Sequence, residues 1–495
     1  MGLPKEARES LQWDENQESP AYYSSASNSQ VYGPNEYPLE KVGLHGDAQS
    51  IASSTRQFVP SPSPATPDPH KLDVSRLVTL PPPYPRHHPA VNNSHPDLAS
   101  IRTNLRSLLD WEDVKSTKER FKEKADSRRD QEQSSLTDRR SQLRYNIQEN
   151  LRSGVMTYAD AAKAEADFQA IEDRKSQDSV QNIFDTFQTE VANPLHALFC
   201  ERITKANASM EHLRSRLSNV AQELNPNQTQ EEGDEQPELL EMLTLLKWLF
   251  EAREQLHREM FELENERNDL YKDIVVLPYA QAGNKEKVKE ANEFFRRDAQ
   301  DRKVTLEKEI LKRHEDFMNV VEQNVSRGVE AQLSAFWDIA PGLLAIVQKV
   351  PQRLEDLDIL IPPQEYEENP VYHQFPLQYL YSLLAHAGRS AYQFIESQVN
   401  LLCLLHEVKT AVMIAGSRLL ETQRCLEGED IASVDTEMKA IRADEEARLT
   451  DDLKDKVALV ESQWKEALGK ALEGCKDRVE AFLVQRQGWD DSLKE

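Results

Sequence analysis

A leucine or methionine occupies every seventh position between residues 242 and 277, and this repeat constrains the fold more than any other feature of the sequence. The six positions are Met242, Leu249, Leu256, Leu263, Leu270 and Leu277. The second seam position is held by Leu239, Leu246, Arg253, Met260, Arg267 and Ile274. A seven-residue repeat of this kind predicts a long helix that buries a narrow stripe against another helix in a left-handed seam.

The two arginines on this seam influence the choice of partner helix. Arg253 and Arg267 must reach solvent or pair with carboxylates, which argues against a simple parallel zipper between two chains. We therefore favour an antiparallel hairpin within one chain, with Pro278 and the following QAGN sequence as the turn. The returning helix is expected at about 284–340, where Pro341-Gly342 breaks or bends it. An intermolecular seam, and with it self-association of the chain, remains an alternative.

The distribution of proline divides the rest of the chain. Fifteen of the 25 prolines lie in the first 96 residues. Residues 1–95 are rich in Ser, Pro, Asn and Tyr and cannot bury enough apolar surface to offset chain entropy, which predicts a disordered arm. The proline-poor remainder predicts an all-α fold: long charged helices at 96–224, an acidic linker at 225–237, the antiparallel coiled-coil hairpin at 238–350, a proline-rich extended connector at 351–376 and a C-terminal helical hairpin at 377–495.

Several residues mark expected helix ends. Asp97 is a candidate N-cap for the first helix, and Gly154 interrupts the helical pattern. Thr157 is a candidate N-cap for the helix that follows. Asn193-Pro194 is expected to kink that helix or to restart it, because proline lacks a backbone N–H. From about 432 to 487 one long acidic helix is expected.

Residues 399–416 form the most apolar stretch of the chain. They are close to the length of a membrane-spanning helix. However, His406, Glu407 and Lys409 lie near the middle of the stretch, where charged side chains are costly in a bilayer. A helix buried by its neighbours explains the composition better.

Cysteine usage indicates a reducing compartment. Cys200, Cys403, Cys425 and Cys475 form no CxxC pair and no zinc-ligand spacing, so we expect free thiols. The first residues lack the apolar stretch of a secretory signal. We therefore expect a cytoplasmic protein.

The charge pattern excludes one class of partner. The formal net charge is -26, which argues against nucleic-acid binding, since that relies on Lys and Arg neutralising phosphates. Residues 115–144 are nevertheless net basic and include Arg128, Arg129, Arg139 and Arg140. These four arginines either belong to a solvated helix face, the reading we favour, or form a basic strip for lipid or a partner.

One short motif carries a binding mechanism. Pro81, Pro82, Pro83 and Tyr84 fit the PPxY pattern that WW domains recognise as a preformed polyproline II turn. A disordered arm makes such a ligand reachable. The motif predicts a WW-domain protein as a partner, with a proline-rich spacer and an incidental tyrosine as the alternative.

Motifs for catalysis are absent from the sequence. There is no glycine-rich phosphate loop, no GxSxG elbow and no HExxH pair. We therefore expect no enzyme, no catalytic residue, no cofactor and no metal. Aromatic residues gather at 334–344 and 365–381, where they either plug the place at which helices splay, the reading we favour, or form an exposed anchor for a partner.

These observations favour a non-enzymatic scaffold or adaptor that binds protein partners through helix faces and short motifs in the arm. The alternative is a crescent-type helical protein that binds and remodels membranes in trafficking or cytoskeletal organisation. An enzyme of unrecognised type is a third hypothesis, and it requires a concave pocket with convergent polar groups near 334–381.

Overall fold

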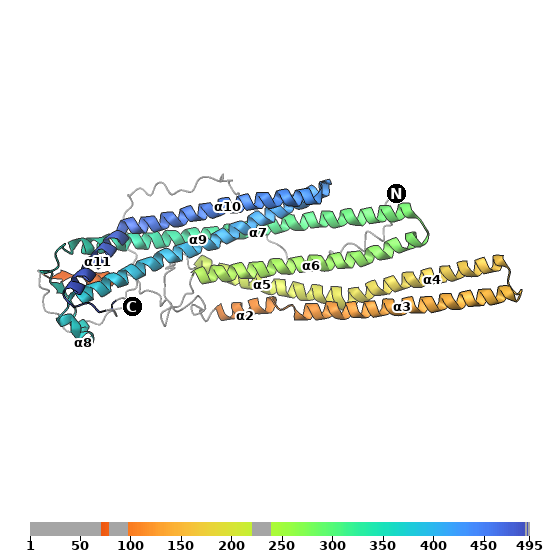
Figure 1. Cartoon of the computed structure of the whole chain (residues 1–495), viewed down its shortest axis with the longest axis horizontal. Helices are drawn as coiled ribbons and strands as arrows, with labels where there is room; N and C mark the ends of the chain where they lie inside the picture. The colour runs from red at the N-terminus through yellow and green to blue at the C-terminus, as the bar shows by residue number, and fades with distance from the viewer. Residues whose placement is uncertain (1–70, 79–97, 220–238, 491–492, 494–495) are drawn as a thin grey trace. The chain divides into compact units, whose positions relative to one another are not determined.

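The computed structural model describes residues 71–78, 98–219, 239–490 and 493. Within this part nearly every residue belongs to a helix, and long helices pack against one another (Figure 1). The prediction of an all-α fold is therefore confirmed. The expected acidic linker, the candidate N-cap Asp97 and most of the expected disordered arm lie outside the described residues. The chain divides into two units, 1–67 and 68–495, and all the described residues belong to the second unit.

The described elements follow in chain order. They are β1 (Leu72–Asp73), η1 (Ser75–Val78), α2 (Ala99–Leu108), α3 (Glu112–Arg152), α4 (Tyr158–Phe187), the π-helix η3 (Gln188–Ala192), α5 (Asn193–Asn219), α6 (Leu239–Gln281), α7 (Lys285–Lys349), β2 (Ile359–Leu360), α8 (Pro363–Glu368), η5 (Pro370–His373), α9 (Leu377–Glu427), α10 (Ile431–Trp464), the π-helix η6 (Lys465–Gly469) and α11 (Lys470–Gln485).

Helices α6 and α7 form the antiparallel hairpin that the seven-residue repeat predicts. The turn, however, lies after Pro278, which is still inside α6. Gly283 reverses the chain with a φ of +69°, a conformation that glycine adopts without steric cost. The Asn284 side chain then accepts a hydrogen bond from the backbone N–H of Lys287 at 3.1 Å and so caps α7.

Pro341-Gly342 does not break the returning helix, because α7 continues through both residues to Lys349. The expected helix end at about residue 340 is therefore wrong. A proline inside a helix costs about 3 kcal/mol. The turns that follow bury Leu343, Ile346 and Val347 in a hydrophobic core. Each such side chain contributes about 1.5–3 kcal/mol. Burial on the far side of the proline therefore outweighs its local cost.

The expected kink at Asn193-Pro194 takes the form of a π-helix. Residues Gln188–Ala192 widen the turn just before Pro194, so that α4, η3 and α5 run on as one helical segment. A π-turn relieves the clash between a proline ring and the preceding carbonyl groups. The long helix expected at 432–487 is likewise interrupted by a π-turn, η6.

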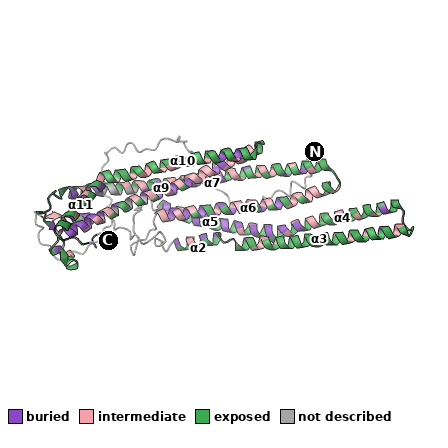
Figure 2. Ribbon diagram, viewed as in Figure 1, coloured by how far each residue is buried: buried purple, intermediate pink, exposed green. Residues whose placement is uncertain are grey.

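The larger hydrophobic core joins helices α2, α5, α6, α7 and α9. Figure 2 shows buried residues running along α5 and α6. The seam residues Met242, Leu249, Leu256 and Leu263 of α6 are at most 2% exposed. The last two, Leu270 and Leu277, are half-buried. At four of its six repeats, the seam is thus covered by other helices of the same chain.

A second core corrects two expectations. Val74 and Leu77, which lie in the segment expected to be disordered, are fully buried in one core with residues of α7, α9 and α11. Their segment contacts α7 and α9. Leu72 and Asp73 pair in parallel with Ile359 and Leu360. The connector at 351–376 is accordingly not simply extended, because it holds β2, α8 and η5 and contributes to this core. Both the segment at 71–78 and the connector at 351–376 have apolar residues at alternating or helical spacing, which explains why the two segments pack into this core.

Candidate functional site

Helices α3 and α4 form a second hairpin, and its turn has the ends that the sequence predicts. Gly154 adopts a φ of +73° after α3 ends. Thr157 then caps α4: its hydroxyl accepts a hydrogen bond from the backbone N–H of Asp160, and the Asp160 carboxylate accepts one from the Thr157 N–H at 3.1 Å. This reciprocal capping box satisfies two N–H groups at the start of the helix.

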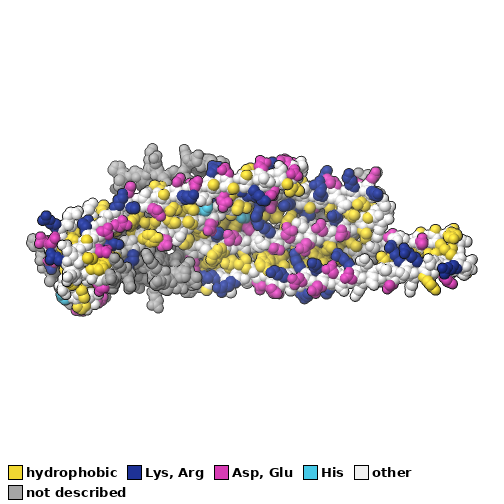
Figure 3. Space-filling model, viewed as in Figure 1, with side chains coloured by type: hydrophobic (Ala, Val, Ile, Leu, Met, Phe, Trp, Pro, Cys, Tyr) yellow, Lys and Arg dark blue, Asp and Glu magenta, His cyan; other side chains and the backbone are white. Residues whose placement is uncertain are grey.

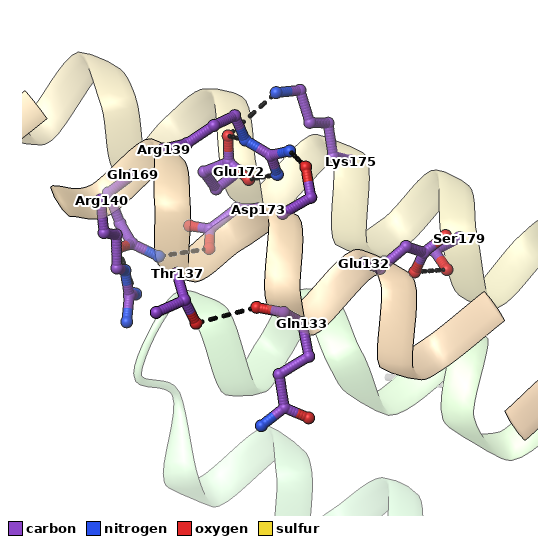
Figure 4. A network of polar contacts seen from close by, with 11 residues as sticks. Glu132, Gln133, Thr137, Arg139, Arg140, Gln169, Glu172, Asp173, Lys175 and Ser179 are labelled. Carbon is purple, nitrogen blue, oxygen red and sulfur yellow. Dashed lines mark hydrogen bonds and ion pairs between the residues drawn. The ribbon is translucent and has the colours of Figure 1, made fainter. Parts of the chain in front are cut away.

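A charged network joins the two helices of this hairpin. Figure 4 shows Arg139 of α3 reaching Glu172 of α4, whose carboxylate accepts hydrogen bonds from the Arg139 Nε at 2.9 Å and Nη2 at 2.5 Å. Lys175 adds a third contact at 2.9 Å. The hydrogen bond from Arg139 is the main reason that the pKa of Glu172 falls to about 2, despite the opposing effect of burial. Arg139 is therefore one of the side chains that join α3 to α4.

The other arginines of the proposed basic strip are only loosely engaged. Arg128 and Arg129 lie 3.5 Å from Glu132 and Asp126 on their own helix. Arg140 donates to Gln169 of α4 at 3.4 Å. Arg128 and Arg129 thus contact only their own helix, Arg140 has one long hydrogen bond across the hairpin, and Arg139 alone has an ion pair across it.

The two seam arginines are accommodated in the way that an antiparallel hairpin requires. Arg253 lies 3.1 Å from Glu254 and donates to Asn207 of α5 at 3.3 Å. Arg267 is 7% exposed, and burial lowers the pKa of its guanidinium although the nearby Glu264 carboxylate opposes the shift. A carboxylate and an amide of the same chain therefore contact Arg253, and a carboxylate of the same chain lies near Arg267.

Among the described elements, helix α10 packs mainly along α9. Val434 and Met438 in its first turns are 1% exposed, yet no residue from 439 to 467 is buried. Leu449, Leu453, Val457 and Val460 are spaced four, four and three residues apart and are all half-buried. Their spacing places these four residues on one apolar face, and this face is only partly covered.

The aromatic cluster at 365–381 is largely internal. Tyr372, Tyr379 and Tyr381 are at most 8% exposed. Tyr381 meets Trp489 edge-on, with ring centroids 5.0 Å apart. Burial raises the pKa of Tyr379 to about 12. This part of the cluster plugs the end of the second core, whereas Trp337 of the 334–344 segment is half-exposed.

The space beside Trp337 is small. A cavity of about 20 Å³ is lined by side chains that include Leu333, Trp337 and Trp464. That volume holds roughly one water molecule. Among the described residues no group of three or more His, Cys, Asp or Glu side chains is placed to hold a metal ion. The four cysteines are free thiols.

One described helical segment, Gln398–Glu427, is long and apolar enough to cross a membrane by length and composition, and 28% of its most apolar window is buried. It packs against α7 and α10 as part of α9. Lys409 lies 3.0 Å from Glu322 of α7, and Glu407 pairs with Lys247 of α6. The charges at the middle of the segment therefore have partners on neighbouring helices.

The PPxY residues Pro81, Pro82, Pro83 and Tyr84 lie outside the described part of the chain, so the WW-ligand prediction stays a prediction. Comparison with known proteins adds no relative: no family model, no curated protein and no solved structure matches the chain. The function must therefore be argued from the surfaces described above.

Proposed function

We propose that the protein is a non-enzymatic scaffold or adaptor of the cytoplasm, which holds protein partners on a helix face and by short motifs in its N-terminal arm. The half-covered row of α10 is the observation that carries this proposal. An apolar row at helical spacing with one open side is the kind of surface that the apolar face of a partner helix covers.

The charge around this row indicates the kind of partner. Residues 427–461 carry twelve acidic and five basic side chains. Asp451, Asp452 and Asp455 are all exposed on α10 beside the apolar row. Complementary charge favours encounter and discriminates against acidic partners. The fitting partner is therefore a basic amphipathic helix.

The PPxY motif supplies a second proposed contact. A WW domain would bind Pro81, Pro82 and Tyr84 independently of the helical core, so one protein could hold two partners at once. This combination is what distinguishes an adaptor from a single-partner binding protein. The crescent-type alternative ranks lower, because Arg139 of its basic strip is already engaged by Glu172.

The proposal is tested by replacing the apolar row in the full-length chain. The variant Leu449→Glu, Leu453→Glu, Val457→Glu adds three charges to the open face. The matched control, Ala440→Glu, Ala443→Glu, Ala447→Glu, adds the same charge at exposed positions of the same helix. Circular dichroism verifies that both variants retain their helical content.

Partners captured from cells by the wild type, the row variant, the control and a Tyr84→Ala variant are then compared by quantitative mass spectrometry. Their direct binding is verified with purified proteins. We expect one set of partner proteins to be lost only in the row variant. WW-domain proteins should be lost only in the Tyr84→Ala variant. If all four chains capture the same partners, neither surface acts as an adaptor site.

A further inference from the structure

The segment at 71–78 is a short piece of chain whose main contacts are with elements far away in the sequence. The residues before it, and residues 79–97 after it, lie outside the described part of the structure. Its strand β1 pairs with β2, and η1 packs mainly against α9 and also against α7. The segment therefore lies in a site that other parts of the chain build.

Backbone pairing holds the first half of the segment. Leu72 and Asp73 pair in parallel with Ile359 and Leu360, and the Leu72 N–H donates to the Asp358 carbonyl at 3.0 Å. This sheet has two strands, so without β1 the strand β2 has no neighbouring strand in it. An unpaired strand edge is a template for another extended segment. Addition of a strand to such an edge is a recurring way to bind a peptide.

Side-chain contacts make the site selective. Val74 and Leu77 are fully buried in the second core, and Leu72 packs against that core. The Lys71 Nζ lies 3.4 Å from the Asp358 carboxylate. The fitting ligand is therefore an extended peptide with a basic residue, followed by apolar residues one, three and six positions later.

A local turn shapes the segment for this site. The Asp73 carboxylate accepts hydrogen bonds from the Ser75 N–H at 3.0 Å and from the Ser75 hydroxyl at 2.6 Å. An aspartate that bonds to the backbone two residues on forms a turn by itself. Both residues are exposed, so the turn does not depend on burial by the helices. The segment thus carries a strand, a turn and its apolar anchors in one stretch, as a short linear ligand does.

We propose that β2, α7 and α9 form a peptide-binding groove, that residues 71–78 occupy it as an internal ligand, and that a partner segment of the same pattern competes for it. The internal ligand has two fully buried side chains and a two-residue strand, whereas the helices around it are many turns long. Elements with few buried contacts open locally at a lower free energy than the whole protein. Docked and released states therefore exchange, and the released state accepts the partner.

Apolar burial and strand pairing, rather than charge, carry this recognition. Figure 3 shows acidic and basic side chains intermixed over the helical surface. The pair of Lys71 and Asp358 is partly exposed and contributes at most about fivefold to binding. An internal ligand has an effective concentration on the order of millimolar, so a partner must bind more tightly or be held nearby. The inference goes beyond the scaffold function and does not depend on it, since the α10 row and the PPxY motif take no part.

The test measures binding of a fluorescein-labelled peptide of residues 71–78 to the full-length chain by anisotropy. The open variant, Val74→Asp, Leu77→Asp, keeps its own segment out of the groove and should bind the peptide saturably. Wild type should bind at least about tenfold more weakly, because its groove is open in a tenth or less of the molecules. A Val74→Asp peptide should not bind. The matched Ser75→Asp peptide adds the same charge at an exposed position and should bind much like the unaltered peptide.

A charge exchange locates the bound peptide. The Asp358 side chain is 62% exposed, so Asp358→Lys can be added to the open variant without burying a charge. This change should weaken binding of the unaltered peptide and restore binding of a Lys71→Asp peptide. Glu355→Lys changes an exposed acid of the same connector and is the matched control, which should favour neither peptide by a comparable factor.

Hydrogen exchange in the unaltered chain gives a second measurement, which decides if the open variant does not fold. Millimolar peptide should speed exchange of the chain's Leu72 amide, because it prevents redocking, and the Val74→Asp peptide should not. The proposal is overturned if wild type and the open variant bind equally, or if the Val74→Asp peptide binds like the unaltered one. Failure of the Lys71→Asp peptide to restore binding, or unchanged exchange at Leu72, also overturns it.

Discussion

Arg313 of α7 binds both carboxylate oxygens of Glu254 on α6, with its Nε 2.9 Å from one oxygen and its Nη2 3.0 Å from the other. Glu254 is 4% exposed. Burial alone would raise the pKa of this carboxyl, but the hydrogen bonds from Arg313 and the nearby charge of Arg253 leave the pKa below its usual value. A buried charged pair thus links the two arms of the central hairpin.

Removing one member of this pair should destabilise the fold strongly. Glu254→Gln leaves the Arg313 charge without its main partner, and we expect a loss of about 3 kcal/mol in the free energy of unfolding, measured by urea denaturation at neutral pH. Glu309→Gln is the matched control: Glu309 contacts the same arginine at 3.5 Å but is 62% exposed. Its loss should stay below about 1 kcal/mol. Equal losses in the two variants would show that burial of the pair is unimportant.

Acid should weaken the same region through His257. Burial, reinforced by Arg313, lowers the pKa of His257 to about 4, so the unfolded chain takes up a proton at a higher pH than the folded one. The contribution of neutral His257 to stability is complete above about pH 6.5 and is lost as the pH falls to about 4. The unfolded and folded pKa values of His257 differ by about two and a half units, which corresponds to about 3 kcal/mol of unfolding free energy.

The measurement for this prediction is the urea midpoint as a function of pH. His257→Leu should flatten the decline between pH 6.5 and pH 4. The exposed His212 provides the control, since His212→Leu should leave the slope unchanged. His314 adds to the same decline, because burial also lowers its pKa. An identical slope in wild type and His257→Leu would contradict the prediction.

The seam should be strongest in its buried repeats. Leu256→Ala empties a fully buried position and should cost about 3 kcal/mol of unfolding free energy. Leu277→Ala changes a half-buried position of the same repeat and should cost about 1 kcal/mol or less. Thermal and urea unfolding of the two variants checks this gradient. Comparable losses at both positions would indicate that Leu277 is covered in solution, for instance by a second chain.

The docked segment at 71–78 offers a fourth test. Val74→Asp places a carboxylate in a fully buried position, and we expect the segment to detach. Hydrogen exchange of the Leu72 amide, which donates to the Asp358 carbonyl at 3.0 Å, should then become fast. Lys71→Ala removes only a half-exposed ion pair at 3.4 Å and serves as the control. Unchanged protection in Val74→Asp would mean that Leu77 and the strand pairing suffice to hold the segment.

The sequence predicted those features that depend on local periodicity. The seven-residue repeat was enough to predict the central hairpin, and Gly154 with Thr157 was enough to predict the helix ends at the α3–α4 turn, because each signal acts within a few turns. Pro341 misled the prediction, since its local cost is outweighed by Leu343, Ile346 and Val347, whose burial depends on α9 and α11. Burial against distant elements is not visible in a local pattern.

The same reasoning applies to the candidate surfaces. The apolar row of α10 was visible in the sequence, but its half-open state depends on how much of it α9 covers. The sequence did not identify the exposed apolar side chains Tyr145, Val155 and Tyr158 as a group, because they lie on two helices and a turn, where no single periodicity relates them.

The pairing of β1 with β2 also has a consequence for the order of assembly during synthesis. The two strands are separated by about 290 residues. A ribosome adding roughly 5–20 residues per second needs on the order of 15–60 s to make that length. For this interval Leu72, Val74 and Leu77 have no docking surface, so nascent chains present them to any chaperone or ligand in reach. The segment at 71–78 is therefore anchored by residues that are translated long after it.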